Sequence, residues 1–366
     1  MGFHIVKREN CPLWKKVLFY VLAIAAALLL GGVILLAIGV DPIAYYTRMF
    51  TMGTVGNKIA YKTYINYLKD FVPLVLTSVG LSLAFKMRFW NIGGEGQFIM
   101  GAIAASAVAI LLGNTLPSAL TLLLMCVAAM LAAGLYGLLV AALKTRFGTN
   151  ETLLTLMLNY VAMYLLNYLM QTKTGWNFFL NAAELRPVPQ THPEGAMFPS
   201  IATGGKFSLN ICVIFAFVIG AIIYLYLKRT KQGYEISVVG DSVGTARYAG
   251  MKVNKIVLRT VFLSACLIGL AAAFKMGTVG TMSTAITDDV GWTGVIVAWL
   301  AQLNTIAIFV VSALIGILRY GSVIAAATFS KVDSSFANML QGFILFLVLV
   351  ADFMIRFRIV RTKKEG

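Results

Sequence analysis

Long apolar blocks alternate with short polar segments along most of this chain. The first block, VLFYVLAIAAALLLGGVILLAIGV (residues 17–40), contains no charged residue. A helix rises about 1.5 Å per residue, so ~20 apolar residues cross a hydrocarbon core of ~30 Å. The pattern predicts an all-α polytopic membrane protein of about ten transmembrane helices. We expect them near residues 17–40, 68–86, 98–112, 119–143, 152–170, 209–227, 256–274, 290–301, 303–318 and 337–355.

The distribution of basic residues predicts the orientation of these helices. The formal net charge is +16, and most of the 30 Lys and Arg residues lie in segments that are inside when the amino terminus is cytoplasmic. Cytoplasmic loops of membrane proteins carry such an excess. The basicity therefore indicates topology rather than a nucleic-acid partner, and ten spans place both termini in the cytoplasm. A cleaved signal peptide is the alternative for the first block. That block is longer than the usual apolar region of ~7–15 residues, and no small-residue cleavage site follows it.

Two longer segments interrupt the membrane pattern of what we expect to be a single transmembrane domain, residues 1–366. Residues 172–208 are polar and rich in proline, and they are predicted to form an external loop. Residues 228–255 carry several basic side chains and are predicted to be cytoplasmic. Loops of this length are often functional when ordered, although each could also be a solvated connector.

Glycine-rich stretches interrupt the apolar pattern once in each half of the chain. The first is RFWNIGGEGQFIMGA (residues 88–102), and the second is KMGTVGTMSTAITDDVGWTG (residues 275–294). Glycine weakens a helix by up to ~1 kcal/mol relative to alanine. Non-helical backbone at membrane depth survives only inside protein or beside a water-filled cavity, and transporters use such breaks to bind solutes. The alternative is a pair of ordinary loops with turn glycines. After the first break, Gly101, Ala105 and Ala109 predict close helix packing.

Polar side chains beside the breaks are the candidates for lining a solute path. They are Asn91, Glu95, Gln97, Asn159 and Trp292. Buried amides in a membrane either bond across helices or face a solute, and these residues leave both roles open. Glu95 has the further alternative of capping amides of a broken helix. Asn150 and Glu151 are typical of a helix N-terminus, where a side-chain oxygen caps amides and an acid favours the dipole.

Motifs for catalysis are missing from the sequence. There is no G-x-x-x-x-G-K-[ST] phosphate loop, no H-E-x-x-H and no G-x-S-x-G. Four cysteines without a C-x-x-C pair and two histidines predict neither a structural disulfide nor a metal site. We therefore expect no catalytic residue, and a membrane-embedded enzyme is the second alternative. The favoured interpretation is a pore-forming subunit that lacks its own energy source.

Four stretches, in order along nearly the whole chain, resemble one family. It is the ABC-importer permease family that includes ribose, branched-chain amino acid and nucleoside permeases, and the closest resemblance is to the simple-sugar and nucleoside branch. Trp90 replaces the usual phenylalanine, and Asp241–Ser242 stands where the family often has Asn-Pro. The stretches are PLVLTSVGLSLAFKMRFWNIGGEGQFIMGA, TNETLLTLMLNYVA, GYEISVVGDSVGTARYAGM and GWTGVIVAWLAQLN.

The resemblance implies a permease of a bacterial plasma membrane that pairs with a second, similar permease chain. Cytoplasmic ATPase subunits, which would bind ATP and Mg²⁺, and an external substrate-binding lipoprotein would complete the importer. No cofactor is then expected in this chain. A nucleoside is the first substrate expected, and a ribose-like simple sugar is the alternative.

A chain without an ATP site needs a cytoplasmic surface that receives motion from the ATPase. Within residues 228–255, SVGTARYAG is predicted to form a short helix. Ser242 caps it, Ala246, Tyr248 and Ala249 pack, and Gly250 ends it. The alternative is a solvated loop. The residues expected to couple to the ATPase are Gly240, Asp241, Ala246, Arg247, Tyr248 and Gly250.

Overall fold

The computed structural model describes residues 2–7, 12–57, 59–202, 208–333 and 335–362. In these ranges nine helices are long and apolar enough to cross a membrane, so the chain is a multi-pass membrane protein as predicted. Residues 203–207 of the predicted external loop lie outside the described residues. The elements are β1 (Gly2–Lys7), α1 (Leu13–Ile38), α2 (Pro42–Phe50), α3 (Ala60–Lys86), α4 (Gly94–Leu112), α5 (Ser118–Phe147), α6 (Glu151–Gln171), η1 (Glu194–Ala196), β2 (Ser200–Ala202), β3 (Ser208–Asn210), α7 (Ile211–Arg229), α8 (Lys231–Asp241), α9 (Val243–Tyr248), α10 (Val253–Val279), α11 (Val290–Leu300), α12 (Thr305–Thr328), α13 (Phe336–Arg356) and β4 (Phe357–Thr362).

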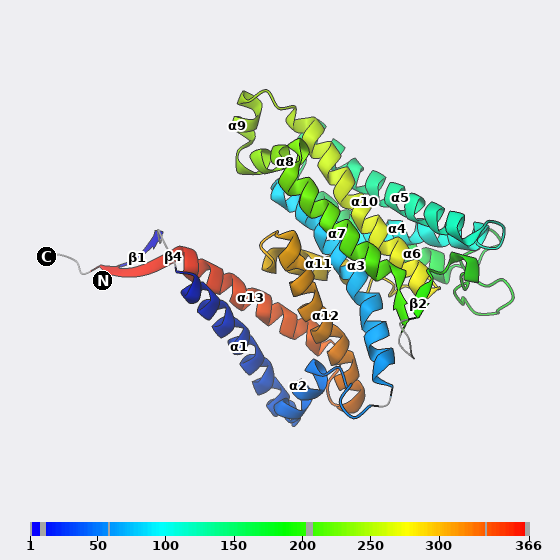
Figure 1. Cartoon of the computed structure of the whole chain (residues 1–366), viewed down its shortest axis with the longest axis horizontal. Helices are drawn as coiled ribbons and strands as arrows, with labels where there is room; N and C mark the ends of the chain where they lie inside the picture. Colours follow the sequence, from blue (N-terminus) through cyan, green and yellow to red (C-terminus); the bar gives the residue numbers. More distant parts are fainter. Residues whose placement is uncertain (1, 8–11, 58, 203–207, 334, 363–366) are drawn as a thin grey trace. The chain divides into compact units, whose positions relative to one another are not determined.

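The helices form two compact units, and the first contains both ends of the chain. It comprises Met1–Ala60 and Ile315–Gly366. In it α1 packs along α13, and β1 pairs with β4 in an antiparallel ribbon (Figure 1). Tyr45 of α2 is fully buried in its apolar core, and its hydroxyl is 2.8 Å from Ser322 Oγ. The pairing of β1 with β4 brings the amino- and carboxyl-terminal segments together.

The second unit, Tyr61–Leu314, is built around the close packing of α4, α5 and α10 (Figure 1). Gly101, Ala105 and Ala109 of α4 are buried, as the sequence predicts. A Cβ added to Gly101 would lie 2.8 Å from Gly269 Cα of α10, and one added to Gly269 would lie 2.2 Å from a carbonyl oxygen of α5. Small residues therefore let the three helix backbones approach closely. This close packing stabilises helix association in a membrane, where no hydrophobic effect drives helices together.

The end of α5 and the start of α6 agree with the capping residues predicted from the sequence. The Asn150 side chain accepts hydrogen bonds from the amides of Thr152 and Leu153 at 3.0 and 3.3 Å, which confirms the predicted N-cap of α6. Glu151 follows in the first turn and forms an ion pair with Lys144 at the end of α5. The turn between α5 and α6 is therefore fixed by its own side chains.

One predicted span, residues 290–301, differs from the other nine. It corresponds to α11, which has only 11 residues and a length of about 16 Å, too short to cross ~30 Å of hydrocarbon alone. The irregular residues 281–289 precede it. Thr281 pairs with Thr191 of the long loop at one end of the unit, whereas Trp299 of α11 lies against Phe85 near the end of α3. We expect the irregular segment and α11 together to make one broken crossing.

Candidate functional site

The first break separates α3 from α4 and is held by an unusual helix end. The amide of Phe89 donates to the carbonyl of Ala84 at 3.1 Å, and Arg88 has a φ of 56°. This is the Schellman arrangement, in which glycine normally occupies the left-handed position. A non-glycine residue there is strained, and such strain is concentrated at functional sites. Asp288 and Asp289, with φ of 46° and 54°, show the same strain at the second break.

Two side-chain amides form a reciprocal pair within the first break. Asn91 Nδ2 donates to Gln97 Oε1 at 3.2 Å, and Gln97 Nε2 donates to Asn91 Oδ1 at 3.0 Å. Asn91 Oδ1 also accepts from the Gly93 amide at 3.1 Å. Both side chains are buried. The pair therefore joins the chain before α4 to the first turn of α4.

Asn159 of α6 holds the same break from the side. Its Oδ1 accepts from the Gly96 amide at 2.8 Å, and its Nδ2 donates to the carbonyl of Ile92 at 2.9 Å. Thr155, one turn earlier on α6, accepts from the Ile92 amide at 3.3 Å. Thr155 was not among the predicted site residues, although its four-residue separation from Asn159 places it on the same helix face.

Glu95 connects the first break to the second. Its Oε2 accepts a hydrogen bond from the Gly291 amide at 2.9 Å, in the first turn of α11. Asp289, the N-cap residue of α11, makes no side-chain cap of its own. A carboxylate at this place satisfies an orphan amide and complements the helix dipole. A Cβ on Gly291 would lie 2.2 Å from the Glu95 nitrogen, so only glycine allows this approach.

These contacts define a break junction, formed by residues 87–97, Thr155 and Asn159 of α6, and the start of α11 at residues 289–292. Of the predicted path residues, Asn91, Glu95, Gln97 and Asn159 are buried and bond to one another, to first-turn amides of α4 and α11 or to the backbone before α4. Trp292 adjoins Gly291 and is 37% exposed. The structure thus brings the predicted set together, and contact with a solute stays a prediction for all five.

Aromatic rings cover one side of the break junction. Trp90 and Trp299 stack with ring centroids 5.3 Å apart and an interplanar angle of 18°, and Phe85 lies 5.7 Å from Trp299. Trp90 is 47% exposed. The departure from the family's usual phenylalanine at position 90 therefore supplies one half of an indole pair that joins the first break to α11.

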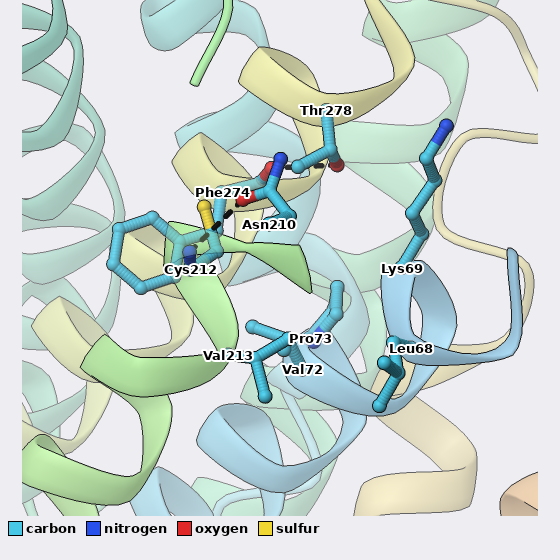
Figure 2. Close-up of a pocket in the computed structure, with 9 residues that line it drawn as sticks. All are labelled: Leu68, Lys69, Val72, Pro73, Asn210, Cys212, Val213, Phe274 and Thr278. Carbon is cyan, nitrogen blue, oxygen red and sulfur yellow. Dashed lines mark hydrogen bonds between the residues drawn. The ribbon is translucent and has the colours of Figure 1, made fainter. Parts of the chain in front are cut away.

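A small pocket lies elsewhere in the unit, where α3, α7 and α10 meet (Figure 2). Its two neutral polar side chains bond to backbone: Asn210 Oδ1 accepts from the Cys212 amide at 2.9 Å, and Thr278 Oγ1 donates to the Phe274 carbonyl at 2.8 Å. The Lys69 ammonium points away from the other lining residues (Figure 2). The pocket therefore offers a solute mainly apolar wall. It is lined by Leu68, Lys69, Val72, Pro73, Asn210, Cys212, Val213, Phe274 and Thr278.

An ion pair that was not predicted from the sequence lies beside this pocket. Lys275 of α10 is buried and pairs with Asp70 of α3. A charged side chain buried inside a membrane protein is costly unless it is paired, so Lys275 requires Asp70. In the described part of the chain, no group of three or more His, Cys, Asp and Glu residues is arranged to hold a metal ion.

The predicted cytoplasmic loop contains two short helices, α8 and α9. The Ser242 hydroxyl accepts from the Thr245 amide at 3.2 Å, and Gly250 has a φ of 75°, so both predicted end signals of α9 are confirmed. Ser242 stands where the family often has proline. Its backbone is extended, and its side-chain cap fixes the turn between α8 and α9. Ala246 is fully buried. The expectation that Tyr248 and Ala249 also pack is wrong for this chain, since both are exposed.

The pair α8–α9 packs directly on the first break. A Cβ on Gly240 would lie 2.0 Å from the carbonyl oxygen of Lys86, the last residue of α3. One apolar cluster contains Met87 and Phe89 of the break together with Ile236 of α8 and Ala246 of α9. Arg259 of α10 adds an ion pair to Glu235 of α8 at 3.0 Å. A displacement of α8–α9 would therefore act on the backbone where α3 ends.

Comparisons with known proteins agree with this architecture. The glucose ABC transporter permease of Haloferax volcanii is 29% identical over 96% of this chain and 92% of its own length. The guanosine ABC transporter permease of Bacillus subtilis is 28% identical over 94% and 96%. The nucleoside ABC transporter permease of Lactococcus lactis is 24% identical over 95% and 94%. No match was found among solved structures.

A family model supplies the assignment. The model described as the permease component of the branched-chain amino acid transport system matches residues 63–349. That range contains both breaks, α8–α9 and the long loop between α6 and α7. The chain therefore belongs to the branched-chain amino acid transport system permease family.

Proposed function

We propose that this chain is the permease subunit of an ATP-driven importer and forms the translocation path for a nucleoside. The break junction is the observation that carries the proposal. The first turns of α4 and α11, each preceded by non-helical backbone, meet inside an apolar helix bundle. The Asn159 amide oxygen and the Glu95 carboxylate accept from their free N–H groups, and the Asn159 amide nitrogen donates to the non-helical carbonyl of Ile92. Such backbone survives at membrane depth only inside protein or beside a water-filled cavity, and transporters use the ends of broken helices to bind solutes.

The aromatic groups of the junction favour a nucleoside over a simple sugar. Trp90 and Trp292 are partly exposed, and an indole face can stack on a planar base. Two of the relatives carry guanosine and nucleoside in their names, while a third is named for glucose at similar identity. A simple sugar is therefore the alternative substrate, because an indole can also cover a sugar face.

The importer would contain three kinds of partner. Cytoplasmic ATPase subunits supply ATP hydrolysis with bound Mg²⁺, an external substrate-binding lipoprotein delivers the solute, and a second, similar permease chain completes the membrane part. The α8–α9 pair fits the ATPase contact. Tyr248 is 97% exposed and Arg247 is exposed beside it, while Ala246 and Gly240 anchor the pair to the first break.

The decisive experiment is uptake by the complete importer. The chain is reconstituted in vesicles with its ATPase, second permease and binding protein, and ATP-dependent accumulation of labelled guanosine is measured against labelled ribose and glucose. The proposal expects guanosine uptake that unlabelled nucleosides inhibit and ribose does not. Vesicles without ATP are the control. Uptake of ribose or glucose without guanosine would identify a simple sugar, not a nucleoside, as the substrate. Uptake of none of the three solutes would contradict an import function.

A further inference from the structure

Residues 191–198 cross one end of the second unit and are fixed to three of its helices. This end is opposite to α8 and α9 (Figure 1). The His192 amide donates to the carbonyl of Gly280 at 2.8 Å, and the Phe198 amide donates to that of Gly277, also at 2.8 Å. Thr191 pairs with Thr281, the first residue after Gly280. The segment therefore holds the end of α10 and the first residue of the second break.

Residues 191–198 pack closely against the ends of α4 and α10. A Cβ on Gly277 would lie 2.4 Å from the Phe198 ring, and one on Gly195 would lie 2.5 Å from the Gly113 carbonyl oxygen at the end of α4. Ala196 and Phe198 are buried. Contacts this close between a loop and helix ends are broken together or not at all, because packed interfaces do not deform continuously.

His192 supplies the polar contact to α4. Its Nε2 lies 2.7 Å from Ser106 Oγ, and the imidazole is buried. Burial lowers the pKa of His192, and the Met276 carbonyl opposes this effect. Among described charged groups nearby, Glu194 is exposed and Lys275 is paired with Asp70. The imidazole is therefore neutral in the closed segment, and protonation favours its release.

The second break joins this segment to the break junction. Residues 281–289 run from the Thr191–Thr281 pair to Gly291, whose amide binds Glu95. A displacement of residues 191–198 would therefore move the start of α11. In the proposed topology the segment is external and α8–α9 is cytoplasmic, so the second break is held from outside and the first break from inside.

We propose that residues 191–198 form an outer strap that must release the second break before solute enters from the outside. The inference rests on the proposed import function, since it assigns the strap to the entry step. The external loop that precedes it, with exposed side chains at residues 182–187, would be the part that an arriving binding protein displaces.

A reversible cross-link tests the strap. Residues opposite each other in an antiparallel pair have Cα atoms about 4.5–5.5 Å apart, which lies within the Cα separation of about 4.4–6.8 Å found in disulfides. Thr191→Cys with Thr281→Cys is made in a chain whose native cysteines are replaced, and the complete importer is assayed in vesicles. Oxidation should reduce uptake to the level without ATP, and a reductant should restore it. The two single-cysteine variants, oxidised in the same way, should transport normally.

Mass spectrometry measures whether the cross-link is complete. Uptake that persists in the fully cross-linked chain would overturn the strap. If the reduced variant and the wild-type chain take up neither nucleoside nor sugar, the proposed function fails instead. Amide exchange then decides on the strap, because it needs no transport.

The amide protons of His192 and Phe198 report opening directly. Closing the strap lowers the pKa of His192, so the open strap binds more protons and closure is most stable above the ordinary value of ~6.5. Lowering the pH from about 7.5 to about 5.5 should speed the exchange of both amides, after correction for intrinsic exchange. In a His192→Gln variant the pH dependence should disappear. Equal pH dependence in both chains would contradict the role of His192, and exchange as fast as in an unprotected peptide would contradict the strap.

Discussion

Gln97 and Trp292 lie at the same junction, yet their surroundings predict different effects of mutation. Gln97 is buried and pairs with Asn91, whereas Trp292 is 37% exposed. Gln97→Ala would leave the Asn91 amide without its partner, at a cost of about 1–3 kcal/mol. We expect a lower thermal midpoint for the purified importer and a lower yield of assembled complex. Uptake per assembled complex should fall less than the yield.

Trp292→Ala should show the opposite pattern. If the indole stacks on the solute, its loss weakens binding by about 1–3 kcal/mol, or roughly five- to hundredfold in KM for uptake. The thermal midpoint should stay near that of the wild-type chain, and Trp292→Phe should recover part of the affinity. An unchanged KM in Trp292→Ala would remove this residue from the solute path.

The sequence located the polar residues of the junction but not their partners. Asn91, Glu95, Gln97 and Asn159 stand out because polar side chains are rare in apolar blocks. Two roles remained open for each, since bonding across helices and facing a solute require the same residue types. The pairing of Glu95 with Gly291 joins residues 196 positions apart, and no local pattern encodes it. The same holds for Lys275 and Asp70.

At the scale of elements, α9 shows how far local signals reach. Its cap, its length and its glycine end follow from nearest neighbours and were predictable. Which of its side chains pack was not, because that depends on α8, α10 and the end of α3. Ala246 is buried in the apolar cluster of this chain, so Ala246→Asp would disturb that cluster. Arg247 and Tyr248 are the exposed pair on which an ATPase contact can be tested.

Arg247→Glu with Tyr248→Ala should separate ATP hydrolysis from transport. Reversing a charge that pairs across an interface, and removing an aromatic anchor, costs about 2 kcal/mol or more, or roughly thirtyfold in affinity. We expect the ATPase to co-purify poorly with the permease, or to hydrolyse ATP without uptake. Lys255→Glu, a charge reversal at an exposed position in the first turn of α10, is the matched control. Normal uptake with bound ATPase in the double variant would shift the contact to the turn between α5 and α6.

At the scale of the whole molecule, the broken crossing determines the topology. Nine long helices alone would place the chain ends on opposite sides of a membrane. The irregular residues 281–289 followed by α11 add a tenth crossing, and an even number returns the chain to the side on which it began. The pairing of β1 with β4 requires the same result, because these two strands hydrogen-bond directly. Broken-helix geometry and strand pairing thus both predict a common side for the two ends.

Side-specific labelling tests this topology. Ala183→Cys in the long loop and Lys231→Cys in α8 are exposed positions, and each is placed alone in a chain whose native cysteines are replaced. A membrane-impermeant maleimide added to intact cells should label Ala183→Cys directly and Lys231→Cys only after the membrane is opened. The positive-inside distribution of Lys and Arg is the physical reason for this direction. Labelling of both positions from one side would contradict the ten crossings, and the reverse pattern would place both termini outside.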